Sequence, residues 1–283
     1  MQGVTPPLGL RYSIRLVRIQ EWWDKLLHLA GSAFLLWFST GSIGVDMAGF
    51  IAYVAAVICL LMGGYTINDA ADLPQDTAAG RENMPQRKHS VTVSIVTLAA
   101  GLILIYAITN AVLPRVIAAV TILIGIEYSL PPIRFKKRGI WGVIVGSVTQ
   151  KPAIFMIFVA IINAWNWLSA VLMIWLFCGG MLGMVGHQIL DYHNDLASGM
   201  RTFVVRHGPR LALMLSIVCA LLIIMTIMAP LIFVPFTEAL PVMCLLAALS
   251  SVYLGKGLRS LRKIRGVVTA QGKVLGVPLT PNR

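Results

Sequence analysis

Charged side chains are scarce in this sequence. Only 12% of its 283 residues are Asp, Glu, Lys or Arg, 58% are hydrophobic, and the mean hydropathy is +0.81. A water-soluble domain of this size needs more charge to cover its surface, so the composition excludes that class. The natural solvent of such a chain is the lipid bilayer.

Cysteine is also scarce, with four residues in the chain (Cys59, Cys178, Cys219 and Cys244). All four lie in apolar stretches and lack the paired spacing of a zinc site. We interpret them as small packing residues rather than metal ligands or disulfide partners.

Long apolar runs are abundant, and roughly 17 to 25 such residues suffice for a membrane-spanning helix. We predict eight spans, near 26–45, 47–67, 91–110, 112–129, 140–163, 166–188, 211–230 and 232–254. The first run lacks a small-residue cleavage site, so we expect it to stay as a span. The predicted fold is an all-α integral membrane bundle. It has an N-terminal arm (1–25), a transmembrane domain (26–254) and a basic tail (255–283).

Acidic residues are the rarer charge, 11 against 23 basic ones, for a net charge of +12. All the basic residues except Arg115 and Lys151 fall in the arm, the tail or three connections between spans. By the positive-inside rule these segments are cytoplasmic, which requires an even number of spans. We expect the basic residues to face anionic lipid rather than nucleic acid. In a bacterial or archaeal cell this places the chain in the inner or plasma membrane.

Carboxylates gather where the second span ends. Asn68, Asp69, Asp72 and Asp76 are spaced for one face of a helix that continues this span. Carboxylates this close repel one another at a membrane boundary unless a cation lies among them. Mg²⁺ suits such a site, because it binds through one or two carboxylates and leaves positions for phosphate oxygens.

A second pair, Asp191 and Asp195, follows the sixth span with the same i, i+4 spacing. Four spans separate the two clusters, so both belong on the cytoplasmic face, and two four-helix halves would bring them together across a central cavity. Two metals held in this way would clamp a diphosphate, with Asp72 and Asp191 as the catalytic carboxylates. Ordinary explanations for one cluster alone are a solvated loop face, helix caps or ion pairs with nearby arginines. We interpret His187 and His193 as structural.

A bound diphosphate also needs hydrogen-bond donors. The connection between the fourth and fifth spans runs Tyr128-Ser129-Leu130-Pro131-Pro132-Ile133-Arg134-Phe135-Lys136 and lies on the same side as both clusters. The predicted diphosphate-binding residues are Arg18, Arg81, Tyr128, Arg134 and Lys136.

These motifs resemble those of the UbiA superfamily of intramembrane prenyltransferases. The first cluster matches the NDxxDxxxD signature of that family, and the second signature resembles Asp191, Asp195, Gly199, Arg201, Thr202 and Gly208. The connection from Tyr128 to Lys136 is similar to the corresponding loop of the chlorophyll-synthase-like branch. Together the motifs cover the chain from about residue 18 to 254.

The resemblance implies a helical bundle around a central cavity that opens laterally to lipid. It also implies two Mg²⁺ ions that bridge a prenyl diphosphate to both clusters. An acceptor would then capture the allylic cation left by loss of diphosphate, while the helices keep water away.

Two features of the sequence depart from the pattern of the family. Asn83-Met84-Pro85 stands where an Asn-Arg-Pro triplet is usual, and Arg81 and Arg87 are the candidates to replace that arginine. The family has nine spans against the eight predicted, and the basic tail stands where the ninth would lie.

Other functions have weaker support. A cation- or proton-coupled transporter would also place acids in the membrane, but it does not explain ligand spacing beside basic loops. The DxxDGxxAR pattern of CDP-alcohol phosphotransferases is absent. The sequence does not identify the acceptor, which is a small molecule or a lipid. Candidate contacts for it are Tyr65, Trp141, His187, Gln188 and Tyr192, and each is equally compatible with ordinary packing.

Overall fold

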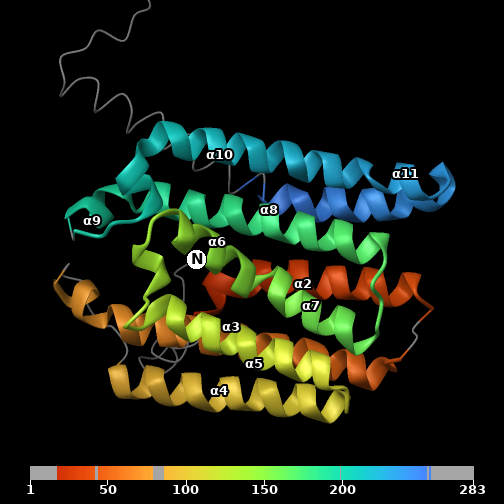
Figure 1. Ribbon diagram of the computed structural model, residues 1–283, viewed down its shortest axis with the longest axis horizontal. Helices are drawn as coiled ribbons and strands as arrows, with labels where there is room; N and C mark the ends of the chain where they lie inside the picture. Colours follow the sequence, from red (N-terminus) through yellow and green to blue (C-terminus); the bar gives the residue numbers. More distant parts are fainter. Residues whose placement is uncertain (1–17, 42–43, 79–85, 198, 254, 256–283) are drawn as a thin grey trace, which may run out of the picture. The chain divides into compact units, whose positions relative to one another are not determined.

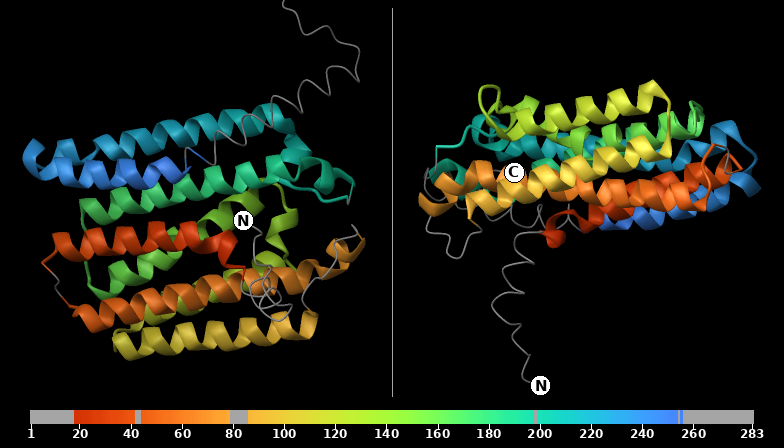
Figure 2. Two further views of the ribbon diagram at one scale, coloured as in Figure 1. Left: turned by 180° about the vertical axis from the view of Figure 1, so that it is seen from behind. Right: turned by 90° about the horizontal axis from the view of Figure 1, so that it is seen from below.

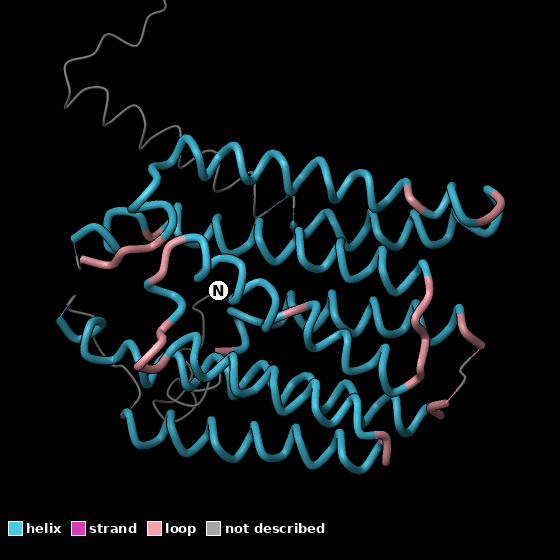
Figure 3. Tube along the Cα trace, viewed as in Figure 1, coloured by secondary structure: helices cyan, strands magenta, loops and turns pink. Residues whose placement is uncertain are grey.

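The computed structural model describes residues 18–41, 44–78, 86–197, 199–253 and 255. These residues form helices joined by short connections, and no strand occurs among them (Figure 3). The labelled helices are α2 (Ile19–Ser39), α3 (Met47–Ala78), α4 (Arg87–Ile108), α5 (Val112–Ser129), α6 (Ile140–Gln150), α7 (Pro152–Ile161), α8 (Trp167–Leu190), α9 (Tyr192–Ala197), α10 (Phe203–Met228) and α11 (Pro230–Phe233). A 3₁₀ turn, η1, covers Phe135–Lys137, and a further helix covers Phe236–Tyr253. The predicted all-α class is confirmed.

Seven helical segments in the described part of the chain are long and apolar enough to cross a membrane. They are Met47–Pro74, Arg87–Ile108, Val112–Ser129, Ile140–Ile161, Trp167–Leu190, Phe203–Phe233 and Phe236–Tyr253. Each corresponds to one of the predicted spans from the second to the eighth. Large apolar side chains such as Ile103, Leu123 and Met225 are more than half exposed on these helices, as expected where lipid covers them.

The predicted first span corresponds to α2, which is not one of the seven. This helix begins at Ile19, within the predicted arm, and its first half carries Asp24, Lys25 and His28. These polar residues lower its mean hydropathy below that of the other spans. The count of eight therefore stays a prediction, as does a ninth span, whose expected position in 256–283 lies outside the described residues.

Proline and glycine break the helical conformation at two places, one inside a predicted span and one just before another. In 140–163, Lys151 leaves the helical conformation (φ −139°, ψ −79°) and Pro152 begins the next helix, so that α6 and α7 replace one continuous helix. In α10, Gly208 adopts φ 81° directly before Pro209. A positive φ is easy only for glycine, and proline cannot donate to the preceding turn. The straight part of α10 therefore starts near the predicted boundary at residue 211.

The chain divides into two compact units, and the first comprises Met1–Phe135 and Val148–Leu176. Within it, α3 packs along the length of α4, and α2 lies against α3 (Figures 1 and 2). Gly63 on α3 allows the closest approach. A β-carbon there would lie 2.6 Å from Cγ of Leu98, and the Ser94 hydroxyl donates a hydrogen bond to the Gly63 carbonyl across 2.9 Å. This packing fixes the part of α3 that leads into the first acidic cluster.

The second unit comprises Lys136–Ser147 and Phe177–Arg283. Gly179 on α8 faces the ring of Tyr253, whose Cζ would lie 2.2 Å from an added β-carbon. At the other end of the unit, Gly139 forms an isolated backbone bridge with Thr202. Arg206 donates to the carbonyl of Lys137 across 3.4 Å. These contacts join the connection after η1 to the start of α10.

Candidate active site

The first acidic cluster lies on the C-terminal part of α3 in the first unit. Asp72 follows Asp69 by three residues and Asn68 by four, which places its side chain on the same face of the helix as theirs. The Asp69 side chain is only 7% exposed and that of Asp72 is 22% exposed. Asp76 belongs to the same helix, but its side chain lies outside the described residues. The predicted stripe of oxygen atoms therefore exists for the three side chains that the structure describes.

The C-terminal end of α5 reaches this stripe at Asn68. The hydroxyl of Ser129, the last residue of α5, donates a hydrogen bond to Oδ1 of Asn68 across 3.0 Å. Ser129 is almost fully buried. The contact fixes the orientation of the Asn68 amide relative to the two carboxylates that follow it.

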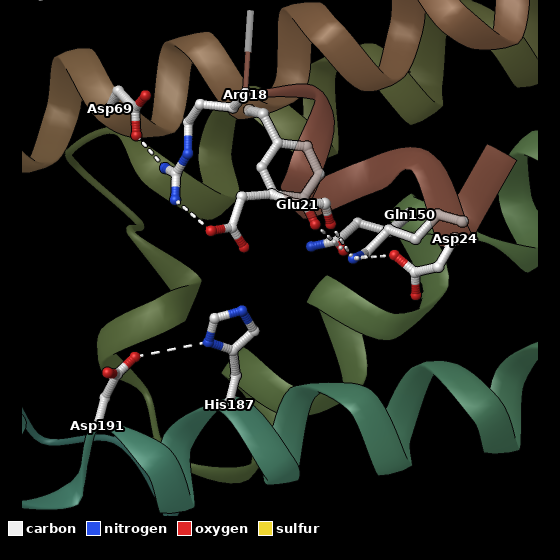
Figure 4. A network of polar contacts seen from close by, with 9 residues as sticks. Arg18, Glu21, Asp24, Asp69, Gln150, His187 and Asp191 are labelled. Atoms are coloured by element: carbon white, nitrogen blue, oxygen red, sulfur yellow. Dashed lines mark hydrogen bonds and ion pairs between the residues drawn. The ribbon is translucent and has the colours of Figure 1, made fainter. Parts of the chain in front are cut away.

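Arg18, at the start of α2, pairs with Asp69 through a hydrogen-bonded ion pair (Figure 4). Its other terminal nitrogen lies 3.4 Å from a carboxylate oxygen of Glu21. Burial alone would lower the pKa of the Arg18 guanidinium, but the charges of Asp69 and Glu21 outweigh this and raise the pKa above its ordinary value. Arg18 therefore remains a cation, held between two carboxylates.

Arg134 contacts the same cluster from the connection after α5. Its Nη2 lies 3.3 Å from Oδ1 of Asp72 and 3.3 Å from the carbonyl oxygen of Ala71. The residue has a positive φ of 47°, and its backbone amide donates to the Leu130 carbonyl across 3.1 Å. The tight turn therefore aims the guanidinium back at α3. Both described arginines that we predicted to bind diphosphate thus contact the first cluster.

The other predicted donors are placed less directly. Tyr128 is half-buried at the end of α5. Lys136 lies in η1, begins the second unit and is only 7% exposed. Arg81 lies outside the described residues. Their diphosphate contacts stay predictions.

The second acidic cluster belongs to the second unit, where α8 ends and α9 begins. The backbone amide of Asp195 donates to the Asp191 carbonyl across 2.8 Å, so the two side chains are one turn apart, as predicted. Oδ2 of Asp191 lies 3.5 Å from Nδ1 of His187, and both of these side chains are about half exposed (Figure 4). His187 orients Asp191 from the preceding turn, which agrees with a structural role for this histidine.

The donor set of the first cluster fits Mg²⁺, because its side chains offer oxygen only, as that ion prefers. In the described part of the chain, no group of three or more His, Cys, Asp or Glu lies close enough to form a metal site by itself. Arginines hold the carboxylates of Asp69 and Asp72 instead. An ion at this cluster would need Asn68, water or phosphate oxygens to complete its coordination.

Sequence reasoning missed two contacts of this site. Glu21 carried a usable signal, since it lies one helical turn after Arg18 at the i, i+3 spacing of an ion pair. Ser129 carried none, because its contact with Asn68 depends on how α5 packs against α3.

Tyr65, a candidate acceptor contact, donates a hydrogen bond from its hydroxyl to Oε1 of Gln150 across 3.1 Å. Its ring also lies beside two cations, with Lys25 Nζ 5.2 Å and Arg18 Cζ 5.9 Å from its centroid.

Comparison with known proteins identifies the family. The sequence model of the UbiA prenyltransferase family matches residues 27–271. The chain belongs to this UbiA prenyltransferase family. It is therefore an enzyme that transfers a prenyl group from a prenyl diphosphate, and its apolar helices make it an integral membrane protein. The resemblance noted from the two acidic signatures is confirmed at the level of the family, while the chlorophyll-synthase-like branch stays a prediction.

Solved structures of UbiA proteins share the fold. A UbiA homologue from Archaeoglobus fulgidus bound to GPP and Mg²⁺ has a TM-score of 0.65 at 18% identity, covering 90% of this chain and 97% of that one. The same homologue bound to DMAPP and Mg²⁺ has a TM-score of 0.65 at 19% identity, with 89% and 96% covered. A digeranylgeranylglyceryl phosphate synthase structure has a TM-score of 0.56 at 16% identity, with 92% and 99% covered. A search of curated proteins gave no match.

Proposed function

We propose that this chain transfers a polyprenyl group to a lipophilic or aromatic acceptor, with Mg²⁺ at its acidic clusters, and releases diphosphate. One observation carries the proposal. The oxygen atoms of Asn68, Asp69 and Asp72 share one face of α3, and Arg18 and Arg134 contact the two carboxylates directly. A metal-bound diphosphate needs both kinds of group in one place, anionic oxygens for the metal and guanidinium donors for the phosphates. The A. fulgidus homologue bound to Mg²⁺ with GPP or DMAPP supports this assignment.

In this proposal Asn68, Asp69, Asp72 and Asp76 hold metal in the first unit, and Asp191 and Asp195 hold metal in the second. When bound, Mg²⁺ would neutralise the negative charge that builds on the diphosphate as it leaves. Asp72 and Asp191 are the carboxylates whose loss should cost most. Arg18, Arg81, Tyr128, Arg134 and Lys136 are the proposed donors to phosphate oxygens. Among the described donors, Arg18 and Arg134 have the strongest support, because each already lies against a proposed metal ligand.

The reaction breaks the bond between the first carbon of the prenyl chain and the bridging oxygen, and the electron pair leaves with the diphosphate. An electron-rich atom of the acceptor then bonds to the allylic cation and gives up its proton. Water would capture the same cation, so the site must be dry. The apolar side chains of the membrane-spanning helices provide that exclusion, and they also accommodate the isoprenoid tail.

We place this chemistry on the cytoplasmic side of the membrane. The support is the distribution of charge along the sequence, since all basic residues except Arg115 and Lys151 lie in the arm, in the tail or in three connections, two of which carry the acidic clusters. Membrane lipid is thus a partner of the protein as well as its solvent. The alternative function, a cation- or proton-coupled transporter, has no support from the matched family, which is one of prenyltransferases.

The deciding experiment measures diphosphate release by the detergent-purified protein. Geranyl, farnesyl and geranylgeranyl diphosphates are offered with Mg²⁺ or with EDTA, against aromatic, tetrapyrrole and glycerol-phosphate acceptors. Magnesium-dependent release that rises with one acceptor would support the proposal and identify that acceptor. If folded protein releases no diphosphate from any donor with any acceptor, the proposed reaction is wrong.

A further inference from the structure

Both arginines at the first cluster are paired with the carboxylates that a metal ion would need. Arg18 pairs with Asp69, and Arg134 lies 3.3 Å from Asp72. A divalent cation and a guanidinium at the same carboxylate repel each other, and this repulsion is only weakly screened at a partly buried site. A metal that binds Asp69 and Asp72 therefore competes with the arginines for these carboxylates.

Each arginine also has a second acceptor that is not a proposed metal ligand. For Arg18 it is the Glu21 carboxylate at 3.4 Å, and for Arg134 it is the Ala71 carbonyl at 3.3 Å. An arginine presents five N–H donors in a fixed plane, so it can keep one partner while another is exchanged. Displacement from the carboxylate therefore leaves each guanidinium tethered beside the cluster, with donors available for a new oxygen.

Metal binding without diphosphate is unfavourable in this arrangement. The ion gains carboxylate ligands, but two partly buried guanidinium groups each lose a carboxylate partner, and the loss of a charged partner at a partly buried site is costly. A diphosphate reverses the balance, because its oxygens accept from the displaced arginines and ligate the metal at the same time. The two ligands then help each other to bind.

We propose that Arg18 and Arg134 are exchangeable counterions of the first cluster, which leave Asp69 and Asp72 for the diphosphate only when metal and diphosphate bind together. The inference rests on the proposed function, since it takes this cluster as the metal site. It adds an assignment to Glu21, which acts as a positioning residue that retains Arg18 during the exchange. Mg²⁺ and diphosphate then enter the site together as a pair, whereas Mg²⁺ without diphosphate binds weakly.

The test measures Mn²⁺ binding in detergent by the electron paramagnetic resonance signal of the free ion, with Mg²⁺ as competitor. Titrations are made without and with geranyl thiodiphosphate, an analogue that ionises slowly, and a protein-free titration corrects for the metal that the analogue binds by itself. The coupling is the ratio of the two metal affinities. Wild type is compared with Arg134→Gln, with Arg18→Gln as a second variant, and with Lys88→Gln, an exposed cation at the start of α4.

In the wild type we expect the analogue to tighten metal binding at least about tenfold, as for a typical allosteric coupling. Arg134→Gln should tighten binding of the metal alone by up to about fivefold, the range for loss of one partly exposed ion pair. It should also reduce the coupling, because one exchange is no longer needed. Lys88→Gln should leave the coupling at its wild-type value, since it removes an exposed charge that belongs to neither arginine pair of the first cluster.

Two results would overturn the inference while leaving the proposed function intact. One is that both arginine variants bind metal alone no more tightly than the wild type does, while the wild type itself binds metal and makes product. The other is a coupling that Arg134→Gln and Lys88→Gln alter equally, which indicates a general effect of net charge rather than an exchange. If the wild type binds no metal even with the analogue, the first cluster is not the metal site and the proposed function falls with the inference.

Discussion

The hydroxyl of Ser129 donates to Oδ1 of Asn68 across 3.0 Å and joins the end of α5 to the first residue of the acidic cluster on α3. An amide oxygen has two lone pairs, so this contact orients Asn68 and leaves the oxygen able to accept a second partner. Through Ser129, the packing of α5 against α3 controls the geometry of a proposed metal ligand. Supporting contacts of this kind typically change metal affinity or activity when they are removed.

Replacing Ser129 with alanine should lower magnesium-dependent prenyl transfer by about 10- to 100-fold, as for other contacts that orient metal ligands. The Mg²⁺ concentration for half-maximal activity should rise, because the Asn68 amide then loses a hydrogen bond that orients it beside the carboxylates. Steady-state assays across a Mg²⁺ titration measure both effects. Ser39→Ala is the matched control, since that hydroxyl donates to the Leu36 carbonyl of its own helix, far along the chain from the acidic cluster. Equal activity of the two variants would contradict the role of Ser129.

Asp72→Ala and Asp191→Ala should each abolish diphosphate release while the protein still inserts into the membrane and purifies as a folded species. Asp72 lies in the first unit beside Arg134, and Asp191 lies in the second unit beside His187. Loss of either should remove a carboxylate that the leaving diphosphate requires, if each cluster holds metal as proposed. The assay is release of inorganic diphosphate with saturating Mg²⁺. Substantial residual turnover in both variants would exclude the two-cluster mechanism.

Glu21→Gln should raise the KM for the prenyl diphosphate several-fold and change kcat much less. The Glu21 carboxylate holds one end of the Arg18 guanidinium, so its loss leaves a donor to phosphate poorly oriented before substrate arrives. Glu238→Gln, an exposed change of the same chemistry, provides the comparison. A fall in kcat with unchanged KM would instead place Glu21 among the groups that act on the transition state.

Metal and substrate should stabilise the protein only in combination. A ligand at 100 times its dissociation constant adds about 2.7 kcal/mol to the free energy of unfolding. We expect Mg²⁺ with geranyl thiodiphosphate to raise the midpoint of thermal unfolding, and EDTA to cancel the increase. Asp72→Ala should show no increase under any of these conditions. A shift of equal size from Mg²⁺ alone would indicate a metal site that needs no diphosphate.

The sequence was sufficient for the parts of this protein that depend on local pattern. Apolar run length predicted seven helices now seen as candidate spans, and the spacing of Asn68, Asp69 and Asp72 predicted their shared face. The family followed from the acidic signatures, which require no knowledge of packing. The break at Lys151 was readable in principle from Pro152, but the run of apolar residues on both sides concealed it.

Contacts between distant segments could not be predicted in the same way. Arg134 was expected to face phosphate because of its charge and its place in a loop, yet it contacts Asp72, 62 residues away. Ser129 was part of a quoted motif without any assigned role, because a serine gives no sign of its partner. α2 begins seven residues before the predicted first span, since its polar first turns pack inside the protein and do not resemble a lipid-facing helix.

The close packing of α3 against α4 allows a paired test of stability. Gly63→Ala should lower the free energy of unfolding by about 1–3 kcal/mol, because its β-carbon would lie 2.6 Å from Leu98 and 2.8 Å from the Thr97 hydroxyl. Gly64→Ala should be neutral or stabilising by up to about 1 kcal/mol, since no atom of the described residues lies within 4 Å of its added carbon. Thermal unfolding in one detergent compares the neighbours. A more stable Gly63→Ala variant would contradict the packing.

The polar first half of α2 has a consequence for how the protein is made. Asp24, Lys25 and His28 make this helix a poor candidate for insertion into lipid by its own hydrophobicity, whereas α3 is strongly apolar. α2 reaches the insertion machinery first, but the partner of Arg18 is Asp69, at the far end of α3. If α2 spans the bilayer as predicted, we expect it to insert together with α3 as a hairpin, because Arg18 then meets its partner as soon as the end of α3 has been synthesised.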